Sequence, residues 1–124
     1  MEVGIKHVME MVVTDNDTAE FFEKGLMPVF STPHMIQLME MTARKSVQPY
    51  LDEGYGTVGT MVEVKHLAST KVGEKVRCES ELIAVEGKRL LFIVKAYNET
   101  VMIGEGKHER YIINEKKFKE RLFN

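Results

Sequence analysis

The chain contains one cysteine, no tryptophan and three prolines among its 124 residues. A single cysteine cannot form an internal disulfide, which fits a reducing, cytoplasmic setting. Cys78 falls in a strand pattern with no histidine beside it, so we expect it to pack in the core rather than act as a nucleophile or ligand. No apolar run approaches the roughly 18 residues of a membrane span, and the first residues do not resemble a signal peptide.

An excess of positive charge is also lacking. The formal net charge is −2, so the chain has no basic excess of the kind that binds phosphate backbones. We therefore expect neither nucleic acid nor a membrane as a partner. Hydrophobic residues make up 44% and charged residues 29%, as in ordinary globular domains, and the length fits a single domain over residues 1–124.

Residues 31–51 form the most apolar stretch of the chain. Ser31 and Thr32 can each cap a helix, and Pro33 suits the first helical position, where its missing N–H has no partner to lose. Because most of the following side chains are apolar, we expect a long helix that is buried on most sides. It would run to about residue 51, unless Pro49 ends it early.

One carboxylate interrupts this helix. Glu40 shares a helical face with Ile36, Ala43 and Val47. An ionised carboxylate in apolar surroundings needs either a partner or a chemical role. From the residues alone, an ion pair at a dimer contact and a catalytic role are both open for Glu40.

The rest of the sequence indicates strands joined by short turns. We expect a short helical turn capped by Asp17 or Thr18, a charged helix or tail near the C-terminus, and strands at residues 7–13, 58–67, 75–86, 89–97 and 101–113. Hairpin-length connections predict antiparallel pairing, and an apolar helix needs a sheet curved about it. The sequence thus predicts an α+β fold in which a curved antiparallel sheet of about five strands wraps a long central helix. One small sheet cannot cover such a helix completely, so we also predict a homodimer that extends the sheet.

The histidines divide into two groups. His7, His34 and His108 have no ligand-like spacing, so we predict no metal site and expect His108 to decorate a strand. His66 lies on the valine face of the strand expected at 58–67. By itself that position fits a half-buried structural histidine as well as a catalytic one.

A set of motifs, in order and with the same spacings, resembles the fluoroacetyl-CoA thioesterases of the hotdog-fold thioesterase superfamily. The set covers about residues 20–118 and comprises Val29-Phe30-Ser31-Thr32, Leu38-Met39-Glu40, Gly59-Thr60, Val64 to Thr70, Val85 to Arg89 and Gly104 to Arg110. The resemblance implies a hotdog fold and hydrolysis of a small or medium acyl-CoA to a free acid and CoA. CoA would be present only as part of the substrate, with no separate cofactor, and the sequence leaves open whether the predicted homodimers pair into tetramers.

The resemblance also implies the catalytic residues, which fall on Thr32, Glu40 and His66. Thioester hydrolysis needs a nucleophile or activated water, a base, and donors for the developing oxyanion. The start of a helix supplies such donors, and a carboxylate beside an imidazole can act as a base near neutral pH. Attack by Glu40, attack by Thr32 and attack by an activated water all remain open at this stage.

The substrate-binding positions implied by the resemblance are Gly59, Arg110, Leu26 and Phe30. By itself, Arg110 fits a surface ion pair equally well. Leu26 stands where the fluoroacetate enzyme has an aromatic lid side chain. This difference argues against a lid that selects a very small fluorinated acyl group. It does not argue against hydrolysis of a thioester.

Two other functions fit the same features. A non-catalytic hotdog module that holds an acyl-CoA or another apolar ligand would have the same pocket without turnover. A hydratase or dehydratase of this fold would need a paired His and Asp, and no Asp stands near His66 in the sequence.

Overall fold

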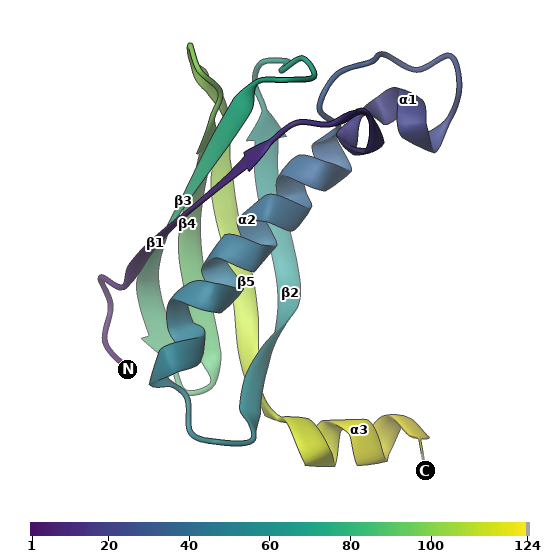
Figure 1. The fold of residues 1–124 in the computed structure, drawn as a ribbon. Coiled ribbons are helices and arrows are strands. Elements are labelled where there is room, and N and C mark those ends of the chain that lie inside the picture. The colour runs from purple at the N-terminus through teal and green to yellow at the C-terminus, as the bar shows by residue number, and fades with distance from the viewer. Residues whose placement is uncertain (124) are drawn as a thin grey trace.

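A computed structural model describes residues 1–123 and shows one long helix packed on the inner face of a curved five-stranded sheet (Figure 1). The elements follow in the order β1 (Lys6–Val12), η1 (Asp15–Asp17), α1 (Ala19–Phe22), α2 (Thr32–Val47), η2 (Gln48–Tyr50), β2 (Tyr55–His66), β3 (Lys75–Glu86), β4 (Arg89–Tyr97), β5 (Met102–Asn114) and α3 (Glu115–Phe123). The strand order is β1-β3-β4-β5-β2 and every pair is antiparallel. The predicted architecture is confirmed.

Helix α2 begins one residue earlier than expected. Ser31 is the N-cap and accepts a hydrogen bond from the backbone N–H of His34 at 3.1 Å, so Thr32 is the first helical residue and Pro33 the second. The helix ends at Val47, and Pro49 lies in the following 3₁₀ turn. Because proline has no N–H to donate to the preceding turn, the α-helix ends before Pro49.

The expectation that α2 is buried on most sides is only partly correct. One stripe packs on the sheet; its buried residues are Met35, Leu38, Met39, Thr42, Ala43, Ser46 and Val47. The opposite side is open to solvent, with Met41 39% exposed beside exposed Gln37 and Arg44. The polar residues at helical spacing make α2 amphipathic, so the sheet need cover only one side.

Strand β2 carries inner-face residues on both sides of a bulge. The bulge lies between Gly59 and Met61, where the register against β5 shifts by one residue. It keeps Gly59 facing α2 while Val62 and His66 face the same way further along. β2 pairs only with β5, so among the described residues its other edge is unpaired, and Val62 on it is 37% exposed.

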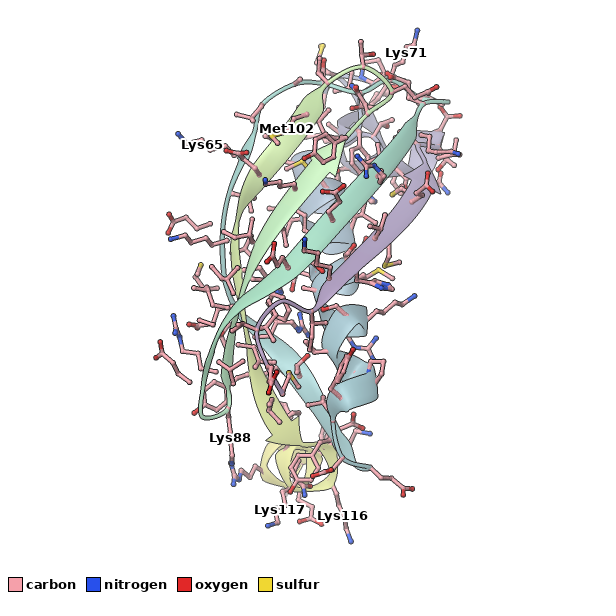
Figure 2. All side chains as sticks on the ribbon, turned by 90° about the vertical axis from the view of Figure 1, so that its left-hand side faces the viewer. Lys65, Lys71, Lys88, Met102, Lys116 and Lys117 are labelled. Carbon is pink, nitrogen blue, oxygen red and sulfur yellow. The ribbon has the colours of Figure 1, made fainter. Side chains whose placement is uncertain are left out.

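The core between α2 and the sheet is apolar. Phe30, Leu82, Phe92 and Ile103 are fully buried there, as is Cys78. Burial raises the pKa of the Cys78 thiol to about 11, which leaves it protonated and confirms its packing role. On the other side of the sheet the side chains are largely charged, and Figure 2 shows Lys65 pointing away from the fold. No helix within residues 1–123 is long and apolar enough to cross a membrane.

Candidate active site

Thr32 and His66 meet at the start of α2. Thr32 Oγ1 lies 2.7 Å from Nδ1 of His66, although 34 residues separate them in sequence. The contact is possible because Ser31 caps the helix and leaves the Thr32 hydroxyl free. The interpretation of Thr32 as only an N-cap is therefore wrong.

The other ring nitrogen of His66 has no hydrogen-bond partner. Nε2 is buried and unpaired among residues 1–123, which costs free energy unless another group reaches it. Burial lowers the pKa of His66, and the backbone of Ala68 offsets part of that shift. In the tautomer whose Nδ1 accepts from the Thr32 hydroxyl, the ring proton lies on Nε2, which is then a donor that lacks an acceptor.

Glu40 lies with Arg110 at the middle of α2. Glu40 Oε2 is 3.7 Å from Nη1 of Arg110, whose side chain is only 7% exposed while that of Glu40 is 38% exposed. Arg110 is fixed by Thr57, to which it donates from Nε to the hydroxyl at 2.7 Å and from Nη2 to the backbone carbonyl at 2.9 Å. The Arg110 guanidinium is therefore anchored inside the fold and is not a surface group, whereas the Glu40 carboxylate that it meets stays partly exposed.

Gly59 leaves the space that the Glu40 carboxylate fills. A Cβ on Gly59 would lie 2.8 Å from Oε2 of Glu40, closer than real Cβ contacts allow. Any larger side chain at this position would displace Glu40. The structure therefore brings together three of the predicted residues, Glu40, Gly59 and Arg110, in one cluster.

His108 belongs to the same cluster, although no pattern in the sequence indicated this. It is completely buried, with Nδ1 2.9 Å from the carbonyl of Met61 and Nε2 3.2 Å from Nη1 of Arg110. Since Arg110 can only donate, Nε2 accepts and Nδ1 carries the proton. Burial lowers the pKa of His108, and the Arg110 charge lowers it further, although Met61 and Glu40 act in the opposite direction. The expectation that His108 decorates a strand surface is wrong, because position 108 faces α2.

Within one chain the two clusters are separate. Glu40 lies eight residues after Thr32, or about 12 Å along the helix axis at 1.5 Å per residue. His66 hydrogen-bonds to Thr32, so the Glu40 carboxylate of the same chain does not reach its ring. The chain therefore presents a Thr32–His66 pair and a Glu40–Arg110 pair at two points along the inner face.

A shallow, open depression of about 360 Å³ surrounds the Thr32–His66 pair. Phe30 forms part of its wall, although the ring is otherwise buried in the core. Leu26 lies in the loop before α2, is 45% exposed and is not among the residues that line this depression. Among the first three residues of α2, Pro33 has no N–H and the N–H of His34 is bonded to Ser31. The backbone N–H of Thr32 is therefore the available donor at the positive end of the helix.

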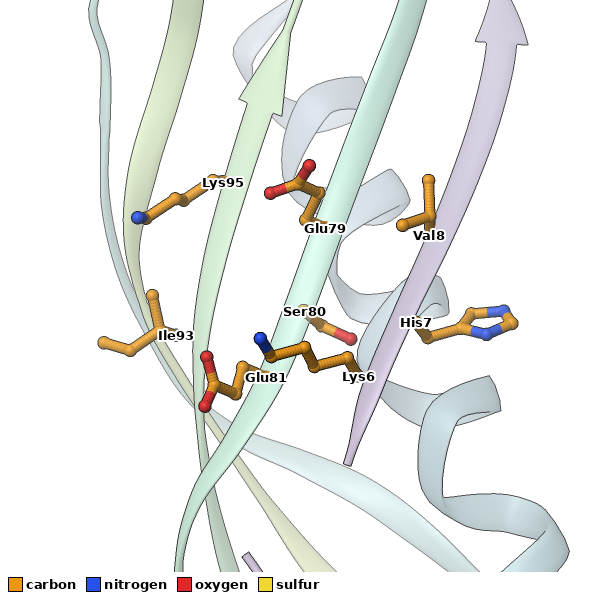
Figure 3. Close-up of a pocket in the computed structure, with 8 residues that line it drawn as sticks. All are labelled: Lys6, His7, Val8, Glu79, Ser80, Glu81, Ile93 and Lys95. Carbon is orange, nitrogen blue, oxygen red and sulfur yellow. The ribbon is translucent and has the colours of Figure 1, made fainter. Parts of the chain in front are cut away.

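A second depression, of about 510 Å³, lies at the β1 side of the sheet and is shown in Figure 3. Lys6 and Lys95 alternate there with Glu79 and Glu81 on β3. Such alternation is typical of a solvated sheet surface. Among residues 1–123 there is no group of three or more His, Cys, Asp and Glu side chains that could hold a metal ion.

Comparison with known proteins gives consistent matches. A family model described as fluoroacetyl-CoA-specific thioesterase matches residues 13–116. The fluoroacetyl-CoA thioesterase of Streptantibioticus cattleyicolor is 36% identical over 133 residues, covering 98% of this chain and 92% of that protein. A solved structure of a fluoroacetyl-CoA thioesterase superposes with a TM-score of 0.94 at 34% identity, covering 98% and 95% of the two chains. A hot-dog-like protein from Thermanaerovibrio acidaminovorans superposes with a TM-score of 0.91 at 27% identity, covering 99% and 91%.

Proposed function

Because the chain belongs to the fluoroacetyl-CoA-specific thioesterase family and has the hotdog fold, we propose that it hydrolyses the thioester bond of an acyl-CoA. The observation that carries this proposal is the 2.7 Å contact between the Thr32 hydroxyl and His66 at the start of a helix. It combines a nucleophile, a base and a positive helix end in one depression. A variant of the similar fluoroacetyl-CoA enzyme has been solved with acetyl-CoA, which supports an acyl-CoA substrate here.

The active enzyme in this proposal is a homodimer joined through β2. The unpaired edge of β2 can pair with a second copy, as exposed strand edges readily do. Antiparallel pairing about a two-fold axis near Val62 sets the His66 end of one strand beside the Gly59 region of the other. Since Gly59 lies against Glu40, the Glu40 carboxylate of the partner subunit would then approach the unpaired Nε2 of His66.

Each complete site would then contain a triad drawn from two chains. Nδ1 of His66 accepts the proton of the Thr32 hydroxyl, and Nε2–H donates to Glu40 of the partner subunit. Arg110 and Thr57 of the partner subunit hold that carboxylate in place. This is the nucleophile–base–carboxylate order that activates hydroxyl nucleophiles in unrelated folds.

The reaction proceeds in two balanced steps. Thr32 Oγ1 attacks the thioester carbonyl as its proton moves to His66, the backbone N–H of Thr32 faces the developing oxyanion, and the C–S bond breaks. The sulfur takes the proton from His66 and leaves as CoA thiol. A water molecule then gives a proton to His66 and attacks the acyl ester. The ester C–O bond breaks, Thr32 Oγ1 takes that proton back from His66, and the free acid is released.

The proposal needs no metal and no cofactor beyond the CoA of the substrate. We propose a small or medium acyl group, because the depression beside Thr32 is shallow and Leu26 replaces an aromatic lid. A reducing compartment such as the cytoplasm suits a protein whose one cysteine is buried as a thiol. Pairing of dimers into tetramers is compatible with this site but not needed for it.

The test is release of CoA thiol from a panel of short and medium acyl-CoAs. Wild-type protein should turn over at least one of them, while His66→Ala and Glu40→Ala should each lose at least about a hundredfold in kcat. Size-exclusion chromatography with light scattering should show a dimer, and Val62→Lys, which puts like charges at the strand edge, should shift it toward monomer. Calorimetric binding of the acyl-CoA with no thiol released would instead identify a non-catalytic binding module.

A further inference from the structure

Among residues 1–123, helix α3 packs only lightly on the rest of the chain: Glu115 lies against Gly56 and Phe118 is half-buried beside β2 and β5. None of its nine residues, Glu115–Phe123, is buried, and Leu122 and Phe123 are 62% and 82% exposed. Leu122 lies one turn beyond Phe118, so the two form an apolar stripe. A nine-residue helix whose last turn packs on nothing among residues 1–123 is marginal in water, so a further surface would stabilise α3.

A second unpartnered apolar surface lies at the opposite end of the molecule. The segment 19–27 comprises α1 and the loop after it, and its exposed apolar residues are Phe21, Phe22, Leu26 and Met27. His34 of α2 anchors this segment through the Phe22 ring, whose centroid is 5.1 Å from its own. The segment leads directly into Ser31 and Thr32, so anything that packs on it lies next to the candidate active site.

The two surfaces extend beyond the same sheet edge. In Figure 1, α1 and α3 both project past the unpaired edge of β2, one at each end. The register agrees: α3 follows the Tyr55–Asn114 pair at one end of β2, and the Glu115 N–H donates to the carbonyl of Gly54. At the other end, the segment after α1 is hydrogen-bonded to the segment after His66, because the N–H of Phe30 donates to the carbonyl of Thr70.

Two-fold symmetry brings these surfaces together. When two β2 strands pair antiparallel, the Tyr55 end of one lies beside the His66 end of the other. Helix α3 of one subunit then lies at the same end of the dimer as α1 of its partner. This occurs twice, once at each active site.

The charges of the two surfaces are complementary. Helix α3 carries four basic and two acidic side chains, and Figure 2 shows Lys116 and Lys117 pointing out from its end of the molecule. Segment 19–27 carries two acidic side chains and one basic one, and two further aspartates lie just before it within residues 15–17. A net positive helix and a net negative segment attract each other, and they disfavour pairing of two identical surfaces.

From these observations we infer that α3 of each subunit docks on segment 19–27 of the partner subunit, with Phe118 and Leu122 against the exposed phenylalanines. The occupant of each surface is thus a second copy of this chain. The contact holds in place the segment that leads into Thr32, and so braces the entrance to the active site. The inference rests on the β2-paired dimer of the proposed function.

Disulfide trapping between two variants tests this contact directly. Phe21→Cys and Leu122→Cys proteins are purified separately, mixed, allowed to exchange subunits and oxidised gently. Within one chain the two positions are separated by the length of β2, roughly 36 Å at 3.3 Å per residue, so a link between them must join two subunits. Cys78 is buried and its thiol pKa is raised to about 11, so it does not compete.

We expect a covalent heterodimer from this mixture, and none from Phe21→Cys mixed with Val8→Cys, whose exposed cysteine lies on the far edge strand β1. Leu122→Asp should weaken dimerisation about tenfold, and Val8→Asp should not. If the wild-type protein is a dimer and hydrolyses acyl-CoA but the Phe21–Leu122 pair does not link, the docking inference is wrong and the proposed function stands. If Leu122→Asp leaves the dimer unchanged but abolishes binding to lipid vesicles, α3 serves a membrane surface instead.

Discussion

Ser31 caps helix α2 through the backbone N–H of His34, and this leaves the neighbouring Thr32 hydroxyl 2.7 Å from Nδ1 of His66. Two adjacent hydroxyl residues thus have different tasks. One completes the hydrogen bonding of the helix end, and the other faces the depression in which a thioester can lie. The division of tasks allows stability and activity to be separated by experiment.

Thr32→Ala should lower kcat by about a hundredfold or more with little change in melting temperature, because the hydroxyl is exposed and caps nothing. Thr32→Ser should keep most of the activity. The matched variant Ser31→Ala should cost roughly 1 kcal/mol of the free energy of unfolding and affect kcat less. Steady-state kinetics and thermal unfolding measure both effects, and equal loss of stability in the two alanine variants would contradict the assignment of the cap.

Attack by Thr32 itself makes a prediction for mass spectrometry. Rapid acid quenching during turnover of a slow acyl-CoA should show an acyl adduct on the peptide that contains Thr32. The adduct should be absent in Thr32→Ala. An adduct on the Glu40 peptide would assign the attack to that carboxylate, and no adduct at all would favour an activated water.

Gly59→Ala should lower activity more than its small change in volume suggests. The added Cβ would lie 2.8 Å from the Glu40 carboxylate, so the carboxylate must leave its position beside Arg110. We expect at least a tenfold loss in kcat but little loss of stability, because the carboxylate at the end of a flexible and partly exposed side chain can move aside. Thr60→Ala, which changes the neighbouring exposed residue, is the control and should retain activity.

Glu40→Gln should move the acid limb of the kcat/KM profile to lower pH. Burial lowers the pKa of His66, whereas a carboxylate from the partner subunit would raise it. Removing that negative charge leaves burial as the dominant influence, so the imidazole stays unprotonated to a lower pH. The profile of free enzyme against pH reports this directly, and an unchanged acid limb would mean that Glu40 does not lie near His66.

Stability should fall as the solution becomes acidic. The pKa of His108 is lowered in the folded protein by burial and by Arg110, so below about pH 6.5 the unfolded chain binds a proton that the folded chain does not. The free energy of unfolding therefore decreases as the pH falls from about 6.5 toward the lowered pKa of His108. Above about pH 6.5 this histidine has no effect on it. Urea unfolding at pH 7.5 and 5.5 should show a smaller difference for His108→Gln than for wild type.

Much of the fold was predictable from local patterns. The strands at 75–86 and 89–97 match β3 and β4, and the capped turn before residue 22 and the final helix are confirmed. Alternation and turn residues are local signals, so one sequence suffices to read them. The solvent exposure of one side of α2 was not predicted, because the apolar Met41 lies among the polar residues of that side.

The site was predictable only in part, because its geometry depends on contacts between distant residues. His108 was assigned to the surface since the strand pattern 102–114 has glycines on the inner face and little hydrophobic alternation. The separate capping role of Ser31 could not be read from two adjacent hydroxyl residues. The unpaired Nε2 of His66 has no signature in a sequence, because it depends on what a second chain supplies.

Subunit complementation tests the central claim most directly. His66→Ala and Glu40→Ala proteins, each inactive alone, are mixed and allowed to exchange subunits. If Thr32 and His66 of one chain work with Glu40 of the other, each heterodimer contains one intact site. Random exchange makes about half of the dimers heterodimers, so about a quarter of wild-type activity should return. A mixture no more active than its separate components would contradict a site shared between subunits.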